Sequence, residues 1–400
     1  PDSFVFCVVL TLVVAVLSLT VCHIGPVELL TSWWDGLSSQ FTLAFQMGLM
    51  VVVCATCARS PQVSKLLDGL SGLVHTRVAA LILLMAFGYV SSMLNWAFCT
   101  IVTPILAMQL AKRVKGLHFP MMVAGGYCCM ILGQCLGPSS TLYSNLATEG
   151  SNYAEIVGKT MTVAETCYNP VNVVLWVILA VCFIVLVLFT QPGDDELVEL
   201  RSIATQADVA PKDYQSREKA TTPAEKMNTC KPIMWVVGAA IFIYIIYSIA
   251  TKGFFATLNM NMVIFMFVGI NCFLFPQPHS WMEAHTDSMH LATDVILQFP
   301  FYGAIMGMMY VEGGLGSVIV NAIVSVATAQ TMPIFSFLSA CVVNLFIPSQ
   351  GGQFTVQGPL IVQAAQSIPG TNLVNCLNGF VFGDECTNLL QPLYVIPALS

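Results

Sequence analysis

Three carboxyl groups lie next to polar residues that interrupt apolar stretches of the chain. Glu165 precedes Asn169-Pro170, and the adjacent Asp384 and Glu385 precede Thr387-Asn388. An ionisable side chain inside a membrane segment is costly and usually serves a function. We therefore expect a proton or a sodium ion to bind at Asp384, Glu385, Glu165, Asn169 and Thr387, with Asp384 as the first candidate. The alternative for Asp384 is a helix cap at the membrane surface.

A second group of polar residues could bind an anion. Gln350-Gly351-Gly352-Gln353 follows Pro348-Ser349 and precedes Thr355 in an apolar region, and Ser139-Ser140-Thr141 follows Gly137-Pro138. Buried amides and hydroxyls are costly unless they are paired. A broken helix also directs free N–H groups and the positive end of its dipole at an anion. The stretch from 350 to 353 therefore predicts an anion site. Ordinary turns between packed helices are the alternative for Pro138-Ser139 and Pro348-Ser349.

The composition predicts a membrane protein. The 400 residues are 56% hydrophobic and 9% charged, with a mean hydropathy of +0.79. Soluble proteins carry about 25% charged residues, and so much apolar surface cannot stay exposed to water. The chain is therefore expected to be an all-α, multi-pass integral membrane protein surrounded by lipid. Its net charge of −7 argues against nucleic acid as a partner.

No catalytic set is recognisable in the sequence. There is no GxSxG motif and no Ser-His-Asp grouping in an apolar stretch, and a Walker A motif is absent. The six His fall in connectors or at the ends of apolar runs, and most of the 15 Cys lie inside such runs, where they behave as small hydrophobic residues. We therefore expect no enzyme activity, no metal site and no cofactor beyond a bound H⁺ or Na⁺.

Apolar runs predict the elements that position these groups. A bilayer core needs about 20 apolar residues per helix. The clear runs are Phe4–Val21, Phe41–Ala58, Val171–Phe189, Ile233–Ala250 and Leu258–Phe275, and shorter or interrupted runs bring the total to roughly ten to twelve elements. The run Val78–Leu110 predicts either two short crossings, which we prefer, or a re-entrant hairpin. Cys22–Gln40 lacks Lys and Arg and is expected to be an outward-facing connector.

A charged segment divides the chain nearly in half. Residues 191–231 carry eight acidic and six basic side chains, and this polar segment cannot form a core. We expect a first transmembrane repeat at 1–190, a surface linker at 191–231 and a second repeat at 232–400. Both halves have a Pro-opened apolar run, then a Pro-Ser break, then an acidic residue (Glu165 or Asp384), in the same order. If each half crosses the membrane five times, the odd number places the second repeat in the opposite orientation to the first.

These motifs resemble the short-chain fatty acid transporter family over nearly the whole chain. The matching segments are Pro1-Asp2, Trp33-Trp34-Asp35-Gly36, Gln46-Met47, Asn95-Trp96, Lys112-Arg113-Val114-Lys115-Gly116, Gln298-Phe299-Pro300-Phe301-Tyr302-Gly303, Gly307-Met308-Met309, Pro348-Ser349 with Gly351-Gly352-Gln353, Val356-Gln357-Gly358-Pro359, and Gly383-Asp384 with Thr387-Asn388 and Gln391-Pro392. The resemblance implies a carrier of small monocarboxylates in the bacterial plasma membrane. It also implies inverted repeats, two re-entrant hairpins, broken transmembrane helices, a scaffold domain with a mobile, elevator-type transport domain, and a homodimer.

The resemblance and the polar motifs together give a predicted site. The expected substrate-binding residues are Ser139, Ser140, Thr141, Asn95, Gln298, Tyr302, Ser349, Gln350, Gly351, Gly352, Gln353, Thr355 and Asn388. The last 148 residues contain no Lys or Arg, so amides and hydroxyls would have to bind the carboxylate. Phe299, Phe301, Tyr302 and Phe354 could line a pocket for its tail, with plain packing as the alternative. The chain departs from the family pattern at Gln350 (a third Gly), Phe354 (Trp) and Glu385-Cys386 (Gln-Trp).

The leading prediction is a secondary active transporter of monocarboxylates such as butyrate, acetate or acetoacetate, driven by a cation through alternating access. One alternative is a carrier of a dicarboxylate or another small organic anion, which the altered residues would permit. The other is a membrane receptor or scaffold that keeps the fold and does not transport.

Overall fold

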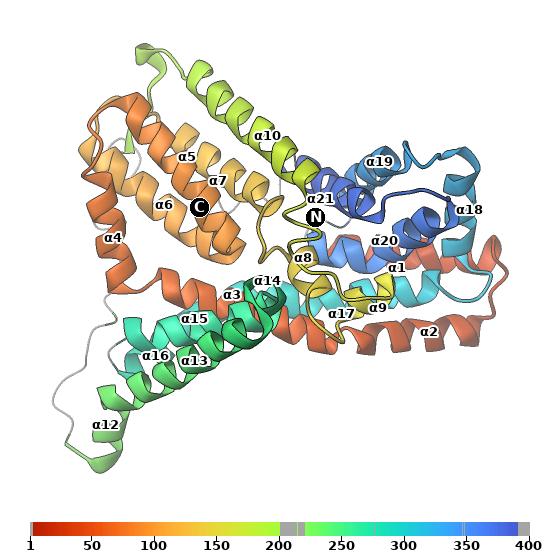
Figure 1. Cartoon of the computed structure of the whole chain (residues 1–400), viewed down its shortest axis with the longest axis horizontal. Helices are drawn as coiled ribbons and strands as arrows, with labels where there is room; N and C mark the ends of the chain where they lie inside the picture. The colour runs from red at the N-terminus through yellow and green to blue at the C-terminus, as the bar shows by residue number, and fades with distance from the viewer. Residues whose placement is uncertain are drawn as a thin grey trace. The chain divides into compact units, whose positions relative to one another are not determined.

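The computed structural model describes residues 3–200, 214, 221–275, 277–345, 347 and 349–390. Within these ranges the secondary structure is helical and contains no strand. The chain forms two compact units, and each draws on both halves of the sequence (Figure 1). Unit 1 comprises Pro1–Gly48, Thr141–Val173 and Thr293–Leu399, and unit 2 comprises Leu49–Ser140 and Val174–Ala292.

Unit 1 contains the helices that carry most of the predicted site. They are α1 (Ser3–Thr20), α2 (Pro26–Ser39), α8 (Thr141–Leu146), α9 (Asn152–Val157), α17 (Thr293–Met309), α18 (Leu315–Val326), α19 (Met332–Asn344), α20 (Gln350–Ser367) and α21 (Leu373–Asn388), with the start of α3 (Phe41–Ala58) and of α10 (Pro170–Phe189). Helices α19, α20 and α21 pack against one another, and α17 packs against both α2 and α20 (Figure 1).

Unit 2 contains the remainder of α3 and α10 and the intervening helices. They are α4 (Pro61–Ser71), α5 (Arg77–Leu94), α6 (Trp96–Arg113), α7 (Phe119–Gln134), η1 (Asp194–Glu196), α12 (Pro223–Asn228), α13 (Lys231–Lys252), α14 (Phe254–Thr257), α15 (Met260–Leu274), α16 (Pro278–Ser288) and η2 (Met289–Ala292). The clear apolar runs of the sequence correspond closely to helices. For example, the run Phe41–Ala58 and α3 share both ends, and the run Val171–Phe189 differs from α10 by one residue.

Most of the predicted connector Cys22–Gln40 is helix α2, which was not predicted from the sequence, and the outward orientation of this segment stays a prediction. Pro26 opens the helix at its first turn and Glu28 lies in that turn, where a carboxylate complements the positive end of the helix dipole. Gly36 lies directly against the backbone of Gly303 on α17, and Gly307 lies against the carbonyl of Ser32. A side chain larger than hydrogen has no room at these positions, so small residues let the two helices approach closely.

Asn95 separates α5 from α6 and explains how one apolar run becomes two helices. Its backbone is extended, with φ −169° and ψ 134°. Its side-chain oxygen accepts hydrogen bonds from the N–H groups of Ala97 at 2.8 Å and Phe98 at 3.2 Å, so that Asn95 caps α6. Each helix has 18 residues, which is about 27 Å at 1.5 Å per residue. Two helices of this length agree with the preferred reading of Val78–Leu110, although their crossing of a bilayer stays a prediction.

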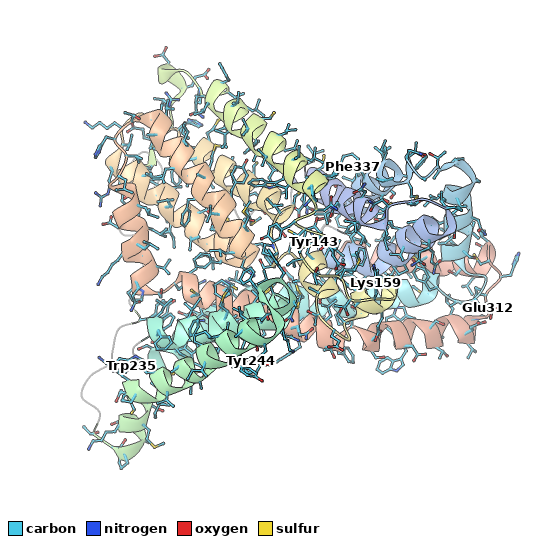
Figure 2. All side chains as sticks on the ribbon, viewed as in Figure 1. Tyr143, Lys159, Trp235, Tyr244, Glu312 and Phe337 are labelled. Atoms are coloured by element: carbon cyan, nitrogen blue, oxygen red, sulfur yellow. The ribbon has the colours of Figure 1, made fainter. Side chains whose placement is uncertain are left out.

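Helices long and apolar enough to cross a membrane are found in both units. The described residues contain five such stretches, including Pro170–Phe189 and Pro223–Lys252, and five shorter apolar helices. Only 17% of the span at α10 and 28% of that at α13 is buried inside the protein. Trp235 and Tyr244 on α13 are both exposed (Figure 2). Such apolar surfaces are suited to contact with lipid.

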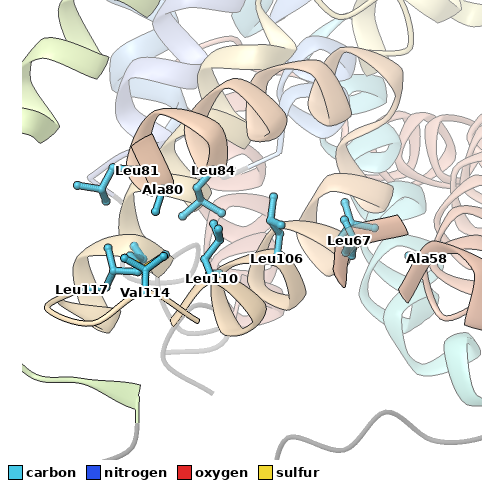
Figure 3. Close-up of a cluster of buried hydrophobic side chains, with 12 residues drawn as sticks. Ala58, Leu67, Ala80, Leu81, Leu84, Leu106, Leu110, Val114 and Leu117 are labelled. Carbon is cyan, nitrogen blue, oxygen red and sulfur yellow. The ribbon is translucent and has the colours of Figure 1, made fainter. Parts of the chain in front are cut away.

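A hydrophobic cluster in unit 2 lies among α4, α5, α6 and the segment that leads to α7. Leu67, Leu84, Leu106 and Leu110 are fully buried there, and Val114 and Leu117 close one end of the cluster (Figure 3). Part of the predicted linker at 191–231, residues 201–213 and 215–220, lies outside the described residues. Of its middle part only Tyr214 is described, with its hydroxyl 3.0 Å from Asp287 on α16. The division into repeats at 1–190 and 232–400 stays a prediction.

Candidate functional site

The site is built around the first turn of α20. Ser349 caps this helix with an extended backbone, and its hydroxyl accepts a hydrogen bond from the Gly352 N–H. A Cβ atom at Gly351 would lie 2.9 Å from the ring of Phe299, and one at Gly352 would collide with the ring of Tyr302. The two glycines thus let the start of α20 lie directly on the aromatic rings of α17.

Gln350 connects three helices at this point. Its side-chain N–H donates to the Glu385 carboxyl on α21 at 3.0 Å. Its side-chain oxygen accepts from the backbone N–H of Leu142 on α8 at 2.9 Å. The Gln350 residue is 5% exposed, so these hydrogen bonds form away from water and hold α8, α20 and α21 at one place.

Asp384 and Glu385 form a buried carboxyl pair on α21. They are 0% and 1% exposed. The side-chain amide of Asn388 lies 3.2 Å from one Asp384 oxygen and 3.3 Å from one Glu385 oxygen, so it can donate to both groups. The second oxygen of Asp384 is buried and has no hydrogen-bond partner among the described residues. Asp384 lies within α21, whose N-terminus is capped by Asn372, so it does not cap the start of this helix.

Asn344, at the end of α19, ties that helix to the carboxyl pair. Its side-chain nitrogen lies 2.8 Å from the Asp384 carbonyl, 2.9 Å from the Thr387 hydroxyl and 2.7 Å from the Asn388 side-chain oxygen. Because Asn388 in turn contacts both carboxyls, the pair is held in a continuous polar network inside the packed helices.

A further set of amides runs along α20. Gln353 donates to the Ala340 carbonyl at 2.8 Å and to the Gln357 side-chain oxygen at 2.9 Å. Its own side-chain oxygen is buried without a partner in the part of the chain that the structure describes. Tyr153 on α9 donates to the Gly351 carbonyl and lies 3.4 Å from the Thr355 hydroxyl. The polar residues predicted at 350–355 are therefore mostly engaged with neighbouring helices.

Unit 1 offers these carboxyls almost no positive charge. It contains a single Lys, Lys159, a single His, His23, and no Arg. Both residues are exposed, and Figure 2 labels Lys159. No ion pair to Asp384 or Glu385 is present among the described residues. Their neighbours donate neutral amide N–H groups, so the negative charge of an ionised pair has no counter-ion in this unit.

The structure brings most of the predicted residues together in unit 1. Gln298 and Tyr302 lie one turn apart on α17, and the Tyr302 hydroxyl donates to Gln298 at 3.0 Å. The predicted residues gathered around α20 and α21 are Thr141, Gln298, Tyr302, Ser349, Gln350, Gly351, Gly352, Gln353, Thr355, Asp384, Glu385, Thr387 and Asn388. Phe299, Tyr302 and Phe354 are all buried and pack against their neighbours.

Glu165 and Asn169 are not part of the buried network. Glu165 is exposed and accepts hydrogen bonds from the Thr162 N–H at 2.8 Å and the Thr162 hydroxyl at 3.0 Å. These donors hold the pKa of the Glu165 carboxyl below its usual value. Burial raises this pKa and the charge of Lys159 lowers it, and both effects are smaller. Asn169 accepts from the Val171 N–H at the start of α10. Both side chains stabilise a loop.

Three predicted residues, Asn95, Ser139 and Ser140, belong to unit 2. Asn95 and Ser139 each keep one buried side-chain atom without a partner among the described residues, the nitrogen in Asn95 and the oxygen in Ser139. Gln391-Pro392 and Pro348, which carry part of the resemblance, lie outside the described residues.

Sequence reasoning missed Asn344, Tyr143 and Tyr153. Tyr143 donates to Asn378 on α21 at 2.9 Å, and Tyr153 packs its ring 4.9 Å from that of Phe354. Asn344 could have been found as the one side-chain amide in the apolar sequence of α19. The two tyrosines contact residues about 200 positions away, so no local pattern indicates them.

Comparisons with known proteins agree with this architecture. The family model of the short chain fatty acid transporter matches residues 1–400. Two curated proteins with the provisional name of short-chain fatty acid transporter, from Escherichia coli (strain K12) and Haemophilus influenzae, are each 28% identical over the whole chain and 89% of their own length. The crystal structure of the Alcanivorax borkumensis YdaH transporter is similar in fold, with a TM-score of 0.54 and 17% identity, covering 99% of this chain and 89% of that one.

The matching proteins are transporters rather than enzymes, which confirms the prediction of a non-enzymatic, multi-pass membrane protein of the bacterial inner membrane. A match over all 400 residues also confirms the resemblance noted in the sequence. The chain belongs to the short-chain fatty acid transporter family.

Proposed function

We propose that this protein moves short-chain monocarboxylates across the membrane together with protons, and that Asp384 and Glu385 take up the coupling proton. The observation that carries the proposal is the burial of this pair at 0% and 1% exposure in a unit whose basic side chains, Lys159 and His23, are both exposed.

The energetics of burial favour a proton at this pair. Moving an ionised carboxylate out of water costs several kcal/mol even after the protein relaxes, unless a counter-charge compensates it. Two carboxylates that share a site also repel each other, so that one of them holds its proton more tightly. Three of the four oxygens of the pair accept from the amide N–H groups of Gln350 and Asn388. Because a metal cation needs several oxygen ligands, this donor set favours a proton over sodium.

The substrate carboxylate is proposed to bind at the start of α20. Ser349, Gln350, Gly351, Gly352, Gln353 and Thr355 lie in or beside its first turns, and Thr141 lies in contact with Gly351. The positive end of the helix dipole and free N–H groups there attract an anion. Because the last 148 residues contain no Lys or Arg, the proposed site binds the anion weakly, through several neutral donors. Such a site suits a carrier that must also release its substrate.

The architecture implied by the family remains part of the proposal. The elements α7 and α19 each have Pro in the first turn, and each is followed by a segment that contains Ser and then by another helix, α8 or α20. This common order supports two inverted repeats with re-entrant hairpins. We further propose that a mobile, elevator-type domain carries the site and that the protein is a homodimer, which cross-linking in native membranes would test.

The test is uptake of labelled butyrate and acetate into proteoliposomes, with proton and sodium gradients imposed separately. Empty vesicles are the necessary control, because protonated fatty acids cross bilayers unaided. We expect saturable uptake driven by an inward proton gradient. Asp384→Asn should lose this dependence and Glu385→Gln should weaken it, whereas Glu312→Gln, which alters an exposed carboxyl of unit 1 (Figure 2), should leave it unchanged.

The outcomes separate the competing readings. Uptake driven by sodium alone would overturn the proton assignment and keep the carrier. Saturable uptake of succinate in place of butyrate would make a dicarboxylate the substrate. No uptake above the empty-vesicle control, from protein shown to be folded, would favour a receptor that retains the transporter fold.

A further inference from the structure

The Gln350 amide has a fixed orientation because its two partners have different chemistry. The Leu142 backbone N–H can only donate, so the Gln350 oxygen must face α8. The Gln350 nitrogen must therefore face Glu385, which accepts through one carboxyl oxygen at 3.0 Å. The other Glu385 oxygen accepts from Asn388. Both contacts of Glu385 thus come from donors, which is the arrangement that an ionised carboxylate prefers.

Protonation of Glu385 changes what Gln350 can bind. When a proton from water forms an O–H bond on this carboxyl, the negative charge that the Gln350 N–H stabilises is lost. Hydrogen bonds to ionised groups are roughly twice as strong as those between neutral groups. A proton on the Glu385 oxygen nearest Gln350 would also make the carboxyl O–H face the Gln350 N–H, so that two donors would oppose each other. Rotation of the Gln350 amide would relieve this opposition, but it would leave the buried Leu142 N–H without its acceptor.

Few other titratable groups lie near Glu385. On α21 itself they are Asp384 and the thiols of Cys376 and Cys386, and α19 contributes the thiol of Cys341. Helix α20 contains no titratable residue. The nearby hydroxyls of Tyr143 and Tyr153 are hydrogen-bonded to Asn378 and to Gly351. Thiols and phenols hold their protons at neutral pH. Asp384 and Glu385 are therefore the groups here that can change charge under these conditions.

Helix α8 is the element that Gln350 connects to Glu385. The chain passes from unit 2 to unit 1 between Ser140 and Thr141, and α8 begins there. Gln350 and Tyr143 provide its side-chain attachments to α20 and α21. We propose that Gln350 is a positioning residue that transmits the charge state of Glu385 to α8. This inference rests on the proposed function for its role in transport, and its structural part stands on these contacts alone.

The first test is a double-mutant cycle on the pH at which uptake is half-maximal. Gln350→Leu removes the donor that stabilises ionised Glu385, so the midpoint should move to higher pH by about tenfold in proton concentration. In the Glu385→Gln background the same substitution should leave the remaining pH dependence in place, because Gln350 acts through Glu385. Gln363→Leu, at an exposed position of α20, is the matched control. An equal shift in both backgrounds would overturn the inference.

The second test needs neither a Gln350 variant nor transport. Hydrogen–deuterium exchange of peptides covering 141–146 is compared in acidic and mildly alkaline buffer, after correction for intrinsic rates. In the wild type, exchange in α8 should be faster at acidic pH by severalfold, whereas Glu385→Gln should show the same corrected rate in both buffers. Identical pH dependence in the two proteins would refute the inference. Uptake by the wild type that does not respond to the proton gradient would refute the proposed function instead. The exchange experiment would then still decide whether the charge state of Glu385 affects α8.

Discussion

The side-chain N–H of Gln350 on α20 donates a hydrogen bond to the carboxyl of Glu385 on α21 over 3.0 Å. The contact joins the first turn of α20 to the end of α21, 35 positions further along the chain. A buried carboxyl without a partner is costly, and the amide beside it supplies a donor. The two residues are therefore best understood as one unit.

Gly352 should tolerate no larger side chain. A Cβ atom there would meet the Tyr302 ring, and overpacking of a close contact costs about 1–3 kcal/mol. Gly352→Ala should therefore lower the thermal unfolding temperature of the purified protein. Gly69→Ala is the control, because Gly69 lies in α4 with no atom within 4 Å of the new methyl group. Equal unfolding temperatures for the two variants would contradict the close packing of α20 on α17.

Asn344 should stabilise the carboxyl pair through its amide. In Asn344→Leu the Thr387 hydroxyl and the Asn388 oxygen each lose this donor, and a buried unsatisfied polar group costs about 1–3 kcal/mol. We expect a lower unfolding temperature and weaker proton-driven uptake. Asn321→Leu makes the same change at an exposed position of α18 and should behave like the wild type. Uptake and stability that match the Asn321 variant would exclude this role.

Gln353→Ala should abolish uptake while the protein still inserts into the membrane. The substitution removes the hydrogen bonds to the Ala340 carbonyl and the Gln357 side chain, and it deletes the buried Gln353 oxygen that has no partner within the described ranges. The measurement is butyrate uptake at matched protein density in the vesicles. Gln363→Ala, on the exposed side of the same helix, is the control. Full uptake by the Gln353 variant would remove this residue from the site.

Glu165→Gln should leave proton-driven uptake intact, because Glu165 is exposed and bonded to Thr162. Folding lowers the pKa of the Glu165 carboxyl. The ionised carboxylate therefore stabilises the folded protein at a pH above the unfolded pKa of about 4.5. This stabilisation is lost as the pH falls through the lower pKa of the folded protein. Any difference in unfolding temperature between wild type and variant should thus shrink in acid. Loss of coupling in Glu165→Gln would restore this residue as a coupling candidate.

The sequence predicts the helices and the polar centre of unit 1 well, for a physical reason. Apolar length determines where a helix lies in a membrane, and an amide-rich stretch such as 350–353 is too costly to bury without partners. A helix is missed where small residues rather than apolar length define it. Helix α2 contains Glu28 and Asp35, which make it resemble a plain connector, yet Gly36 fits it against Gly303.

The partners of the site residues could not be predicted in the same way. Asn344 lies 40 positions before Asp384, and Leu142 lies 208 before Gln350. These contacts depend on how α8, α19, α20 and α21 pack together, and packing leaves no local pattern in the sequence. For the same reason Glu165 was placed with Asp384 by its similar setting in the other half of the chain, although it is exposed in a loop.

The scarcity of positive charge in unit 1 also has an electrical consequence. A protein that neutralised its carboxyl pair with Arg or Lys would keep a constant charge, whereas here the charge of the unit follows the number of protons on Asp384 and Glu385. Each elementary charge that crosses the membrane potential changes the energy by about 2.3 kcal/mol per 100 mV. A substrate anion accompanied by one proton crosses as a neutral pair, and a second proton would make the step drive positive charge inward. If Asp384 and Glu385 take up the coupling protons as proposed, currents recorded across the membrane will count the protons that cross with each substrate.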